Sequence, residues 1–243
     1  YAERAKNEIC SKFNIKEKNL EIKKIITEGD KIKDVRLSDT GGKGLFSKTI
    51  ENELLDNKID IAVHALKDMP SDETSGLTTN CFLERNDPRE VLISRDKKKF
   101  NDLNKGSIIG TSSFRREFQF KRIRNDLKYK LIRGNVDTRI KKLNEKNFDA
   151  IILSFAGLHS LKLDQNITQI FSTSEIIPSA GQGTIALQCR ENDEEIIKIL
   201  KKINHELTYK CVIAERDVLK TLNGDCETPV GVFAHIKNNE LNL

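Results

Sequence analysis

Short apolar runs and longer mixed segments alternate along this chain, and the alternation predicts strands followed by helices. The runs expected to form strands cover Leu20–Ile26, Ile59–Val63, Glu90–Ser94, Ser107–Gly110, Tyr129–Ile132, Phe148–Ser154 and Thr184–Cys189. Helices are expected at Ala2–Phe13, Leu45–Asn57, Phe155–Leu163, Asp193–Ile203 and Leu207–Leu222, with another that ends near Arg124. This order of elements indicates an α/β protein with mixed, mostly parallel sheets.

Two polar, proline-containing segments interrupt the alternation. They are Glu84–Glu90, which we call the first crossing, and Thr173–Gly183, which we call the second crossing. Two such segments suggest two lobes, with the chain returning to the first lobe after it has built the second. We therefore expect a discontinuous first lobe (residues 1–86 with 184–203), a second lobe (87–183) and a small α+β C-terminal domain (204–243). Ligands commonly bind between two such lobes.

Composition and cysteine usage narrow the class of protein. The chain has 243 residues, of which 37% are hydrophobic and 33% are charged, as expected for a globular protein. It contains no apolar run long enough to predict a membrane span. It does not begin with Met, so we expect a processed or trimmed form. The five cysteines (10, 81, 189, 211 and 226) match no zinc or disulfide pattern, so we expect reduced thiols and no metal.

The positive charge is concentrated in one segment, Gly106–Arg139, which we call the basic stretch. It holds nine Lys or Arg residues against three acids, a net charge of +6 in a chain whose total is +5. The rest of the chain is therefore close to neutral. A local excess of this kind points to a site and not to a generally basic surface.

Four arginines in the basic stretch stand where two predicted helices begin. Thr111, Ser112 and Ser113 can cap the first helix, and Arg115 and Arg116 then fall in its first turn, where the helix dipole disfavours cations. Asn135 can cap the second helix, which Arg133 and Arg139 flank. A bound anion would resolve this conflict, so the pattern predicts a pocket for a ligand with several carboxylates or phosphates. The alternative, a solvated basic helix face, suits the remaining cations: Lys121, Arg122, Arg124, Lys128 and Lys130.

Other candidate residues come from loops. Lys67 and Asp68 follow the strand predicted at 59–63, at the end of a strand where ligands often bind in α/β proteins. An aspartate held beside cations could stabilise a positive intermediate or move a proton, although Asp68 could equally cap a turn before Pro70. The glycine-rich segment 40–46 is either a flexible turn or a mobile lid that carries Lys43 and Phe46.

Cys226 differs from the other four cysteines because it lies in a polar loop, Asn223–Pro229. A thiol in such a loop can be a nucleophile or an attachment point, and it can equally be inert. The residues alone therefore predict a two-lobed anion-binding protein with a candidate aspartate and a candidate cysteine, and they specify no reaction.

Seven segments, in order along the chain, resemble the porphobilinogen deaminase (hydroxymethylbilane synthase) family. They are GGKGLF (Gly41–Phe46), DIAVHALKDMP (Asp60–Pro70), GTSSFRRE (Gly110–Glu117), IRGNVDTR (Ile132–Arg139), DAIILSFAGL (Asp149–Leu158), AGQGTIALQCR (Ala180–Arg190) and NGDCETPVG (Asn223–Gly231). The resemblance covers nearly the whole chain. It implies two lobes like those of periplasmic binding proteins and a small third domain.

The resemblance also implies an activity. The family condenses four porphobilinogen molecules head to tail on a dipyrromethane primer, with loss of ammonia at each step, and then hydrolyses the product to hydroxymethylbilane in haem biosynthesis. The cysteine that holds the primer through a thioether matches Cys226, and the catalytic aspartate matches Asp68. The flexible family loop over the active site matches the segment that carries Lys43 and Phe46. The remaining primer- and substrate-binding groups match Lys67, Thr111, Ser112, Ser113, Arg115, Arg116, Arg133, Asn135, Arg139 and Gln182.

Two rival functions remain to be separated from this one. A non-enzymatic two-lobed binding protein for a polyanionic solute would share the lobes, but it would need neither Asp68 nor an attached cofactor. A nucleic-acid-binding domain would carry a basic stripe with interleaved aromatic residues, whereas here the charge gathers at helix starts. The expected partner is therefore the small molecule porphobilinogen, with no nucleic acid and no membrane, and a monomer is the family default. The cytosol and an organelle such as a plastid both stay open as the compartment.

Overall fold

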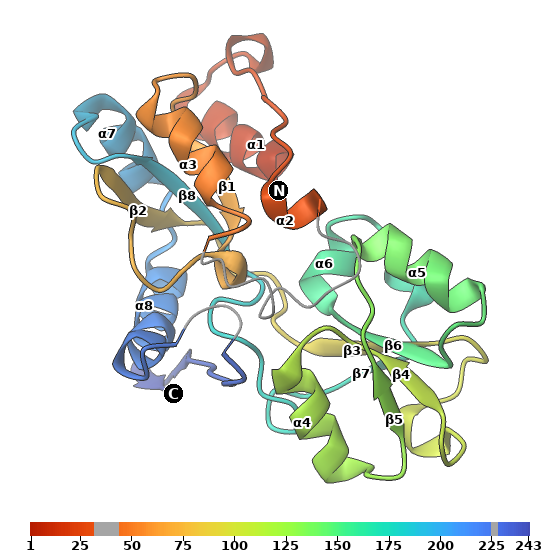
Figure 1. Cartoon of the computed structure of the whole chain (residues 1–243). Coiled ribbons are helices and arrows are strands. Elements are labelled where there is room, and N and C mark those ends of the chain that lie inside the picture. The colour runs from red at the N-terminus through yellow and green to blue at the C-terminus, as the bar shows by residue number, and fades with distance from the viewer. Residues whose placement is uncertain (32–43, 225–227) are drawn as a thin grey trace.

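The computed structural model describes residues 1–31, 44–224 and 228–243, which fold into two lobes joined by the two crossings (Figure 1). The strands are β1 (Ala62–Ala65), β2 (Leu77–Phe82), β3 (Glu90–Ser94), β4 (Ile108–Gly110), β5 (Lys128–Lys130), β6 (Ala150–Ser154), β7 (Gln169–Ile170), β8 (Ile185–Arg190), β9 (His235–Lys237) and β10 (Glu240–Asn242). The α-helices are α1 (Ala2–Phe13), α2 (Glu28–Lys31), α3 (Lys48–Leu55), α4 (Phe114–Ile123), α5 (Val136–Asn144), α6 (Phe155–His159), α7 (Glu194–Ile203) and α8 (Glu206–Thr221). The predicted α/β class is confirmed.

The first lobe is built on a three-stranded sheet in the order β1–β8–β2. Alternate side chains of β8 point to opposite faces of the sheet. Leu187 packs on one face with Ala5 of α1 and Leu200 of α7. Ala186 packs on the other face with Val212 of α8. Because helices cover both faces, β8 is buried along nearly its whole length.

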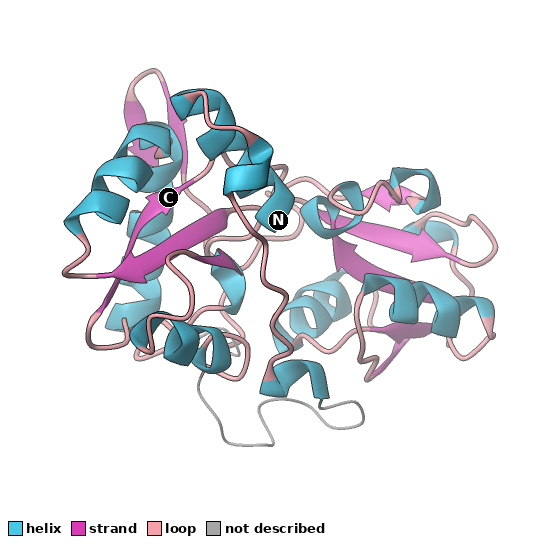
Figure 2. Ribbon diagram, turned by 90° about the horizontal axis from the view of Figure 1, so that it is seen from above, coloured by secondary structure: helices cyan, strands magenta, loops and turns pink. Residues whose placement is uncertain are grey.

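The second lobe is built on a five-stranded sheet in the order β5–β4–β6–β3–β7. Phe120 of α4 packs on one face, with ring centroids 5.0 Å from Phe100 and 4.8 Å from Phe171. Leu143 of α5 and Leu158 pack on the other face. The central strands β3 and β6 are therefore buried at every position. The two sheets lie side by side when the molecule is seen from above (Figure 2).

The expectation of mostly parallel sheets is wrong for the described residues. In the first lobe β8 is antiparallel to both of its neighbours, and in the second lobe β3 is antiparallel to β6 and β7. Parallel pairing is found where β4 meets β5 and β6. The reason lies in the crossings. Each crossing delivers a strand, β3 or β8, into the sheet of the lobe that it enters, and that strand runs against its neighbours.

The strand expected at Leu20–Ile26 is also not found, since these residues have extended or irregular backbone without sheet pairing. Ile22 and Ile26 are 38% and 64% exposed. Alternation along a sequence predicts a strand only where a neighbouring strand can complete the hydrogen-bond ladder.

The two crossings run side by side between the lobes. The amide of Asn86 donates to the carbonyl of Gly183 over 2.9 Å. Gly183 has φ +87°, and a Cβ at this position would lie 2.5 Å from the Asn86 carbonyl oxygen. Glycine is therefore required for the close approach of the crossings. After α8 the chain ends in the hairpin β9–β10, where the turn residues Asn238 and Asn239 both have positive φ, as a tight hairpin turn requires.

Candidate active site

The first turn of α4 is positioned by the strand before it. Gly110 ends β4 in a tightly packed place, where a Cβ would lie 3.0 Å from the side chains of Ile151 and Phe148. Ser113 is the N-cap of α4, and its hydroxyl accepts a hydrogen bond from the Arg116 amide at 3.4 Å. The hydroxyl of Thr111 accepts from the Ser113 amide at 3.2 Å. The predicted cap is confirmed. The hydroxyls of Thr111 and Ser113 both accept hydrogen bonds from backbone amides of this turn.

Arg115 and Arg116 converge on one carboxylate, that of Glu90 at the start of β3. Arg115 Nη2 lies 2.5 Å from Glu90 Oε1, and Arg116 Nη2 lies 2.8 Å from Glu90 Oε2. All three side chains are buried. Burial alone would raise the pKa of Glu90, but the charges of Arg116 and Arg115 outweigh it and lower the pKa to about 2. The Glu90 carboxylate thus partly neutralises the positive charges that were expected to attract an external anion.

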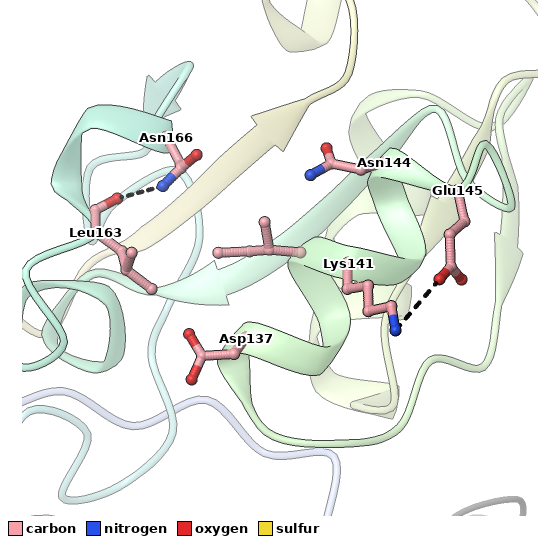
Figure 3. Close-up of a pocket in the computed structure, with 7 residues that line it drawn as sticks. Asp137, Lys141, Asn144, Glu145, Leu163 and Asn166 are labelled. Atoms are coloured by element: carbon pink, nitrogen blue, oxygen red, sulfur yellow. Dashed lines mark hydrogen bonds and ion pairs between the residues drawn. The ribbon is translucent and has the colours of Figure 1, made fainter.

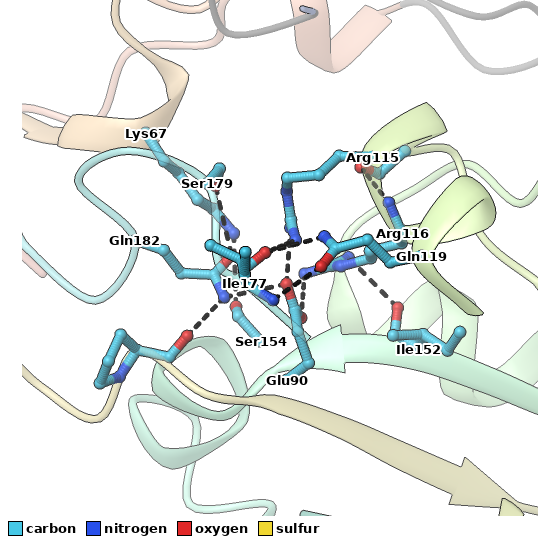
Figure 4. Close-up of polar contacts among 12 residues, drawn as sticks. Lys67, Glu90, Arg115, Arg116, Gln119, Ile152, Ser154, Ile177, Ser179 and Gln182 are labelled. Carbon is cyan, nitrogen blue, oxygen red and sulfur yellow. Dashed lines mark hydrogen bonds and ion pairs between the residues drawn. The ribbon is translucent and has the colours of Figure 1, made fainter. Parts of the chain in front are cut away.

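The second crossing joins the same group of residues. Gln182 Nε2 donates to Glu90 Oε1 at 3.0 Å and to the Pro88 carbonyl at 2.6 Å. Arg115 Nη1 donates to the Ile177 carbonyl at 2.7 Å. We call Glu90, Arg115, Arg116 and Gln182 the Glu90 cluster (Figure 4). It ties the first turn of α4 to both crossings.

Lys67 brings the first lobe to this cluster. It belongs to a short 3₁₀ helix, Leu66–Asp68, that directly follows β1. Lys67 Nζ donates to Ser154 Oγ at 3.3 Å, and Ser154 ends β6 in the second lobe (Figure 4). Burial lowers the pKa of Lys67, and the charge of Asp68 opposes this effect. Lys67 therefore lies at the point where the two lobes meet.

Asp68 and Arg139 face the same region from opposite lobes. Burial, together with the charges of Arg116 and Arg133, lowers the pKa of Arg139 to about 10, and the charge of Asp68 opposes this effect. Asp68 also acts on Tyr1, since burial raises the pKa of that phenol and the carboxylate raises it further. These couplings mean that the Asp68 carboxylate lies within electrostatic reach of the second helix start of the basic stretch.

The second helix start is less tightly built than the first. Asn135 is the N-cap of α5, but its side chain makes no capping hydrogen bond and is exposed. Arg133 is buried, and Arg139 Nε donates to the Gly134 carbonyl at 2.7 Å. The structure thus brings together Lys67, Asp68, Arg116, Arg133 and Arg139, and it leaves the Asn135 side chain in solvent.

The remaining predicted residues are placed in different ways. Lys43 and Cys226 lie outside the described residues. Phe46 is half-buried against Gly29 in the first lobe, where a Cβ on Gly29 would lie 2.5 Å from the Phe46 ring. Ser112 is half-buried next to the cap of α4. A lid role for the glycine-rich segment therefore stays a prediction.

The cations assigned to a solvated face do lie on the surface. Arg122, Lys128 and Lys130 are exposed. Lys121 pairs with Glu117 one turn away at 2.7 Å, and Arg124 pairs with Asp126 at 2.7 Å. Such exposed or half-exposed ion pairs contribute little to stability. The cations that remain as candidates for ligand binding are the arginines at the two helix starts.

A surface pocket lies elsewhere on the second lobe, between α5 and the 3₁₀ helix Asp164–Asn166 (Figure 3). Its walls include Lys141 and Glu145, which form an ion pair at 3.9 Å. None of the predicted site residues lines it. Within the described ranges there is no group of three or more His, Cys, Asp or Glu residues that could hold a metal ion, and no helix there has the length and apolarity to cross a bilayer.

Glu90 is the site residue that the sequence analysis missed. In the sequence it marks the junction between the first crossing and the strand Glu90–Ser94, with no predicted function. The available signal was a charged residue at the head of the apolar run EVLIS, because an ionised side chain in a fully buried strand needs a counter-charge.

Comparison with known proteins gives matches along nearly the whole chain. The family model for "Porphobilinogen deaminase, dipyromethane cofactor binding domain" matches residues 2–198, and that for "Porphobilinogen deaminase, C-terminal domain" matches residues 209–243. A porphobilinogen deaminase of Brevibacillus brevis is 45% identical over 228 residues, which cover 93% of this chain and 74% of the relative. One of a Geobacillus species is 48% identical over 221 residues, covering 90% and 71%. Among solved structures, the periplasmic VFT2 domain of Bordetella pertussis BvgS aligns with a TM-score of 0.41 at 13% identity, over 70% of this chain and 72% of that one.

Proposed function

This chain belongs to the porphobilinogen deaminase family, and we propose that it is a hydroxymethylbilane synthase. It joins four porphobilinogen molecules head to tail on a dipyrromethane primer, releases ammonia at each addition, and hydrolyses the product to hydroxymethylbilane. This is a transferase reaction of haem biosynthesis. The observation that carries the proposal is the meeting of Lys67 and Asp68 from the first lobe with the arginines of the second.

The groups at this meeting point suit a dipyrromethane. Each pyrrole ring carries an acetate and a propionate, so the primer is a polyanion that guanidinium groups can bind through paired hydrogen bonds. Arg116 Nε is a buried donor with no acceptor among the residues that the structure describes. The low pKa of Arg139, caused by burial and by neighbouring cations, is what a nearby carboxylate would offset. Both features support an anionic occupant.

Individual roles follow from position and charge. We assign primer and substrate binding to Lys67, Asp68, Thr111, Ser112, Ser113, Arg115, Arg116, Arg133, Asn135, Arg139 and Gln182. When bound, the dipyrromethane supplies the nucleophilic pyrrole carbon at which chain growth starts. Asp68 is the catalytic residue, because its carboxylate can stabilise the positive charge that develops on the porphobilinogen pyrrole as ammonia leaves. The same carboxylate can take and return the proton of that pyrrole nitrogen.

Further assignments complete the proposal. Cys226 holds the primer through a thioether, and Lys43 and Phe46 belong to a lid. The chain divides into residues 1–86 with 184–203, residues 87–183, and residues 204–243. The return of β8 into the first sheet supports the discontinuous first unit. We take the enzyme to be a monomer that acts on free porphobilinogen, in the cytoplasm or in an organelle such as a plastid.

Intact-mass spectrometry of the purified protein tests the proposal against a non-enzymatic binding protein. The wild type is expected to be heavier than its sequence by one dipyrromethane, and Cys226→Ser is expected to remove the excess mass. Cys10→Ser is the matched control, since Cys10 is a half-buried free thiol in α1, and it should keep the excess. A wild type whose mass equals that of its sequence, and that forms no hydroxymethylbilane, would contradict the proposed function.

A further inference from the structure

The geometry points to Glu90 as a positioning residue that fixes the guanidinium groups of Arg115 and Arg116 for the carboxylates of the oligopyrrole. This inference rests on the proposed function and deepens it. Glu90 belongs to none of the seven segments that carry the family resemblance. It touches both arginines of the first helix start, so one carboxylate sets the direction of two ligand-binding groups.

Relative exposure places Glu90 behind the arginines. The Glu90 side chain is 0% exposed, whereas the side chains of Arg115 and Arg116 are 5% and 7% exposed. The Glu90 carboxylate is therefore the more deeply buried partner of each ion pair. Glu90 supports these groups from the interior and does not occupy the ligand's place.

The carboxylate itself is firmly held. Glu90 is the first residue of β3, where it pairs with Ser154 of β6, and its carbonyl accepts from the Phe171 amide at 3.0 Å. The Gln182 amide fixes Oε1 from the second crossing. The long arginine side chains, in contrast, lose much rotamer entropy when they are held in one geometry. Because the carboxylate is rigid, the arginine side chains lose this entropy when the protein folds and not when a ligand binds.

Charge balance supports the same role. Two guanidinium groups beside each other repel, and burial strengthens the repulsion. One carboxylate between them reduces the pair from two positive charges to a net of one. The cluster then remains attractive to pyrrole carboxylates while both arginines stay in place.

The two carboxylate oxygens are not equivalent, which gives a specific test. Oε1 receives both Arg115 Nη2 and Gln182 Nε2, whereas Oε2 faces Arg116. In Glu90→Gln the carbonyl oxygen of the new amide will take the Oε1 place with its two donors, and the amide NH₂ will then face Arg116. Because two donors cannot bond to each other, the variant is expected to displace Arg116. Arg115 is expected to stay bonded to the amide oxygen and to the Ile177 carbonyl.

The experiment measures four quantities on the whole protein: the primer-loaded fraction by intact mass, KM and kcat for porphobilinogen, and Tm. Glu90→Gln is expected to lower the loaded fraction, or to raise KM of the loaded protein, by roughly ten- to hundredfold. Glu90→Asp is expected to recover most of this loss, because the charge is retained and the flexible arginines can follow it. Arg122→Gln is the matched control, since Arg122 is an exposed arginine of the same helix.

A double variant shows whether Glu90 acts through Arg116. Adding Glu90→Gln to Arg116→Gln is expected to change loading and KM by less than about threefold, far less than it does alone. This comparison also holds if the single variant Glu90→Gln does not fold, because the double variant leaves no guanidinium without an acceptor on the Oε2 side.

Two results would overturn the positioning role while the wild type remains loaded and active. One is wild-type loading and KM in Glu90→Gln, and the other is a double variant at least tenfold worse than Arg116→Gln alone. A wild type without a dipyrromethane would instead overturn the proposed function, and this inference with it.

Discussion

Two buried glutamates flank the crossings, and they are bonded in different ways. Glu90 and Glu215 are both 0% exposed, and each faces arginine. Glu90 receives its hydrogen bonds from side chains, those of Arg115 and Gln182, together with the ion pair from Arg116. Glu215 of α8 also pairs with a side chain, that of Arg85, at 2.6 Å. Its other donors are backbone amides.

Those backbone donors come from two distant segments. The Gly181 amide donates to Glu215 Oε2 at 2.6 Å, and the Ala234 amide donates to Oε1 at 2.7 Å. We call Glu215, Arg85 and these two amides the Glu215 cluster. A carboxylate bonded to backbone fixes the path of the chain, here the second crossing and the C-terminal segment. A carboxylate bonded to side chains fixes the groups that can meet a ligand.

Gln182 connects the two clusters. Its backbone carbonyl accepts from Arg85 Nε at 2.9 Å on the Glu215 side, and its side-chain Nε2 donates to Glu90 Oε1 at 3.0 Å on the other. One residue of the second crossing thus joins the C-terminal helix to the arginines of α4. The comparison predicts that changes on the Glu90 side alter function as well as stability, whereas changes on the Glu215 side alter stability alone.

Asp68→Asn should show the largest effect on function, because Asp68 lies on the Glu90 side beside Lys67. The substitution keeps the shape of the side chain and removes the charge that stabilises the cationic pyrrole. We expect kcat to fall by about 10³-fold or more, with the primer still attached and Tm nearly unchanged. Steady-state assays and intact mass measure these quantities.

The control for this variant is Asp72→Asn, which changes an exposed carboxylate four residues along the chain and should leave turnover unaffected. Near-normal turnover in Asp68→Asn would remove Asp68 from the mechanism. A large loss of Tm would show that the residue supports the fold instead.

Glu215→Gln should show the largest effect on stability. Arg85 is only 11% exposed, so the variant leaves a buried guanidinium without its counter-charge. Losing one partner of a buried pair typically costs about 3–5 kcal/mol of the free energy of unfolding. Urea unfolding measures this loss, and Glu195→Gln, an exposed glutamate in α7, is the matched control. The kcat of the protein that remains folded should change less than about twofold, and a larger change would break the contrast between the two clusters.

Local chemistry explains which parts of the site could be predicted from the sequence. The cap at Ser113 and the position of Arg115 and Arg116 in the first turn of α4 depend on neighbours within one helical turn, so the sequence contains the information. The division between these arginines and exposed cations such as Arg122 follows from the same rule. The positions of Lys67 and Asp68 after a strand were predictable because the apolar run Ile59–Val63 marks one there, although the observed strand β1 begins and ends later, at Ala62–Ala65.

Non-local pairing explains what could not be predicted. Glu90 lies 25 residues before Arg115, and no local rule connects a residue at the head of a strand with a helix start. The antiparallel entry of β8 and β3 depends on the crossings and not on their own residues. The segment 20–26 alternates like a strand, but alternation does not identify a partner strand.

Lowering the pH should reduce the free energy of unfolding of the wild type more than that of Glu90→Gln. This is the smallest of the three predicted effects. The arginines lower the pKa of Glu90 to about 2 from an ordinary value of 4.5, so the native state favours the ionised carboxylate. The resulting stability is present above pH 4.5 and is lost as the pH falls towards 2. Its size is on the order of 3 kcal/mol.

Unfolding free energies measured between pH 7 and pH 2 test this linkage. The wild-type curve should fall more steeply below pH 4.5, and the two curves should approach each other towards pH 2, where about half of the Glu90 carboxyl groups are protonated in the wild type as well. Glu195→Gln, which changes an exposed carboxylate, should follow the wild type throughout. Curves for the wild type and Glu90→Gln that stay parallel would mean that Glu90 gains no charge-dependent stabilisation from Arg115 and Arg116. The Glu90 cluster would then hold its geometry through packing, and its contrast with the Glu215 cluster would need another physical basis.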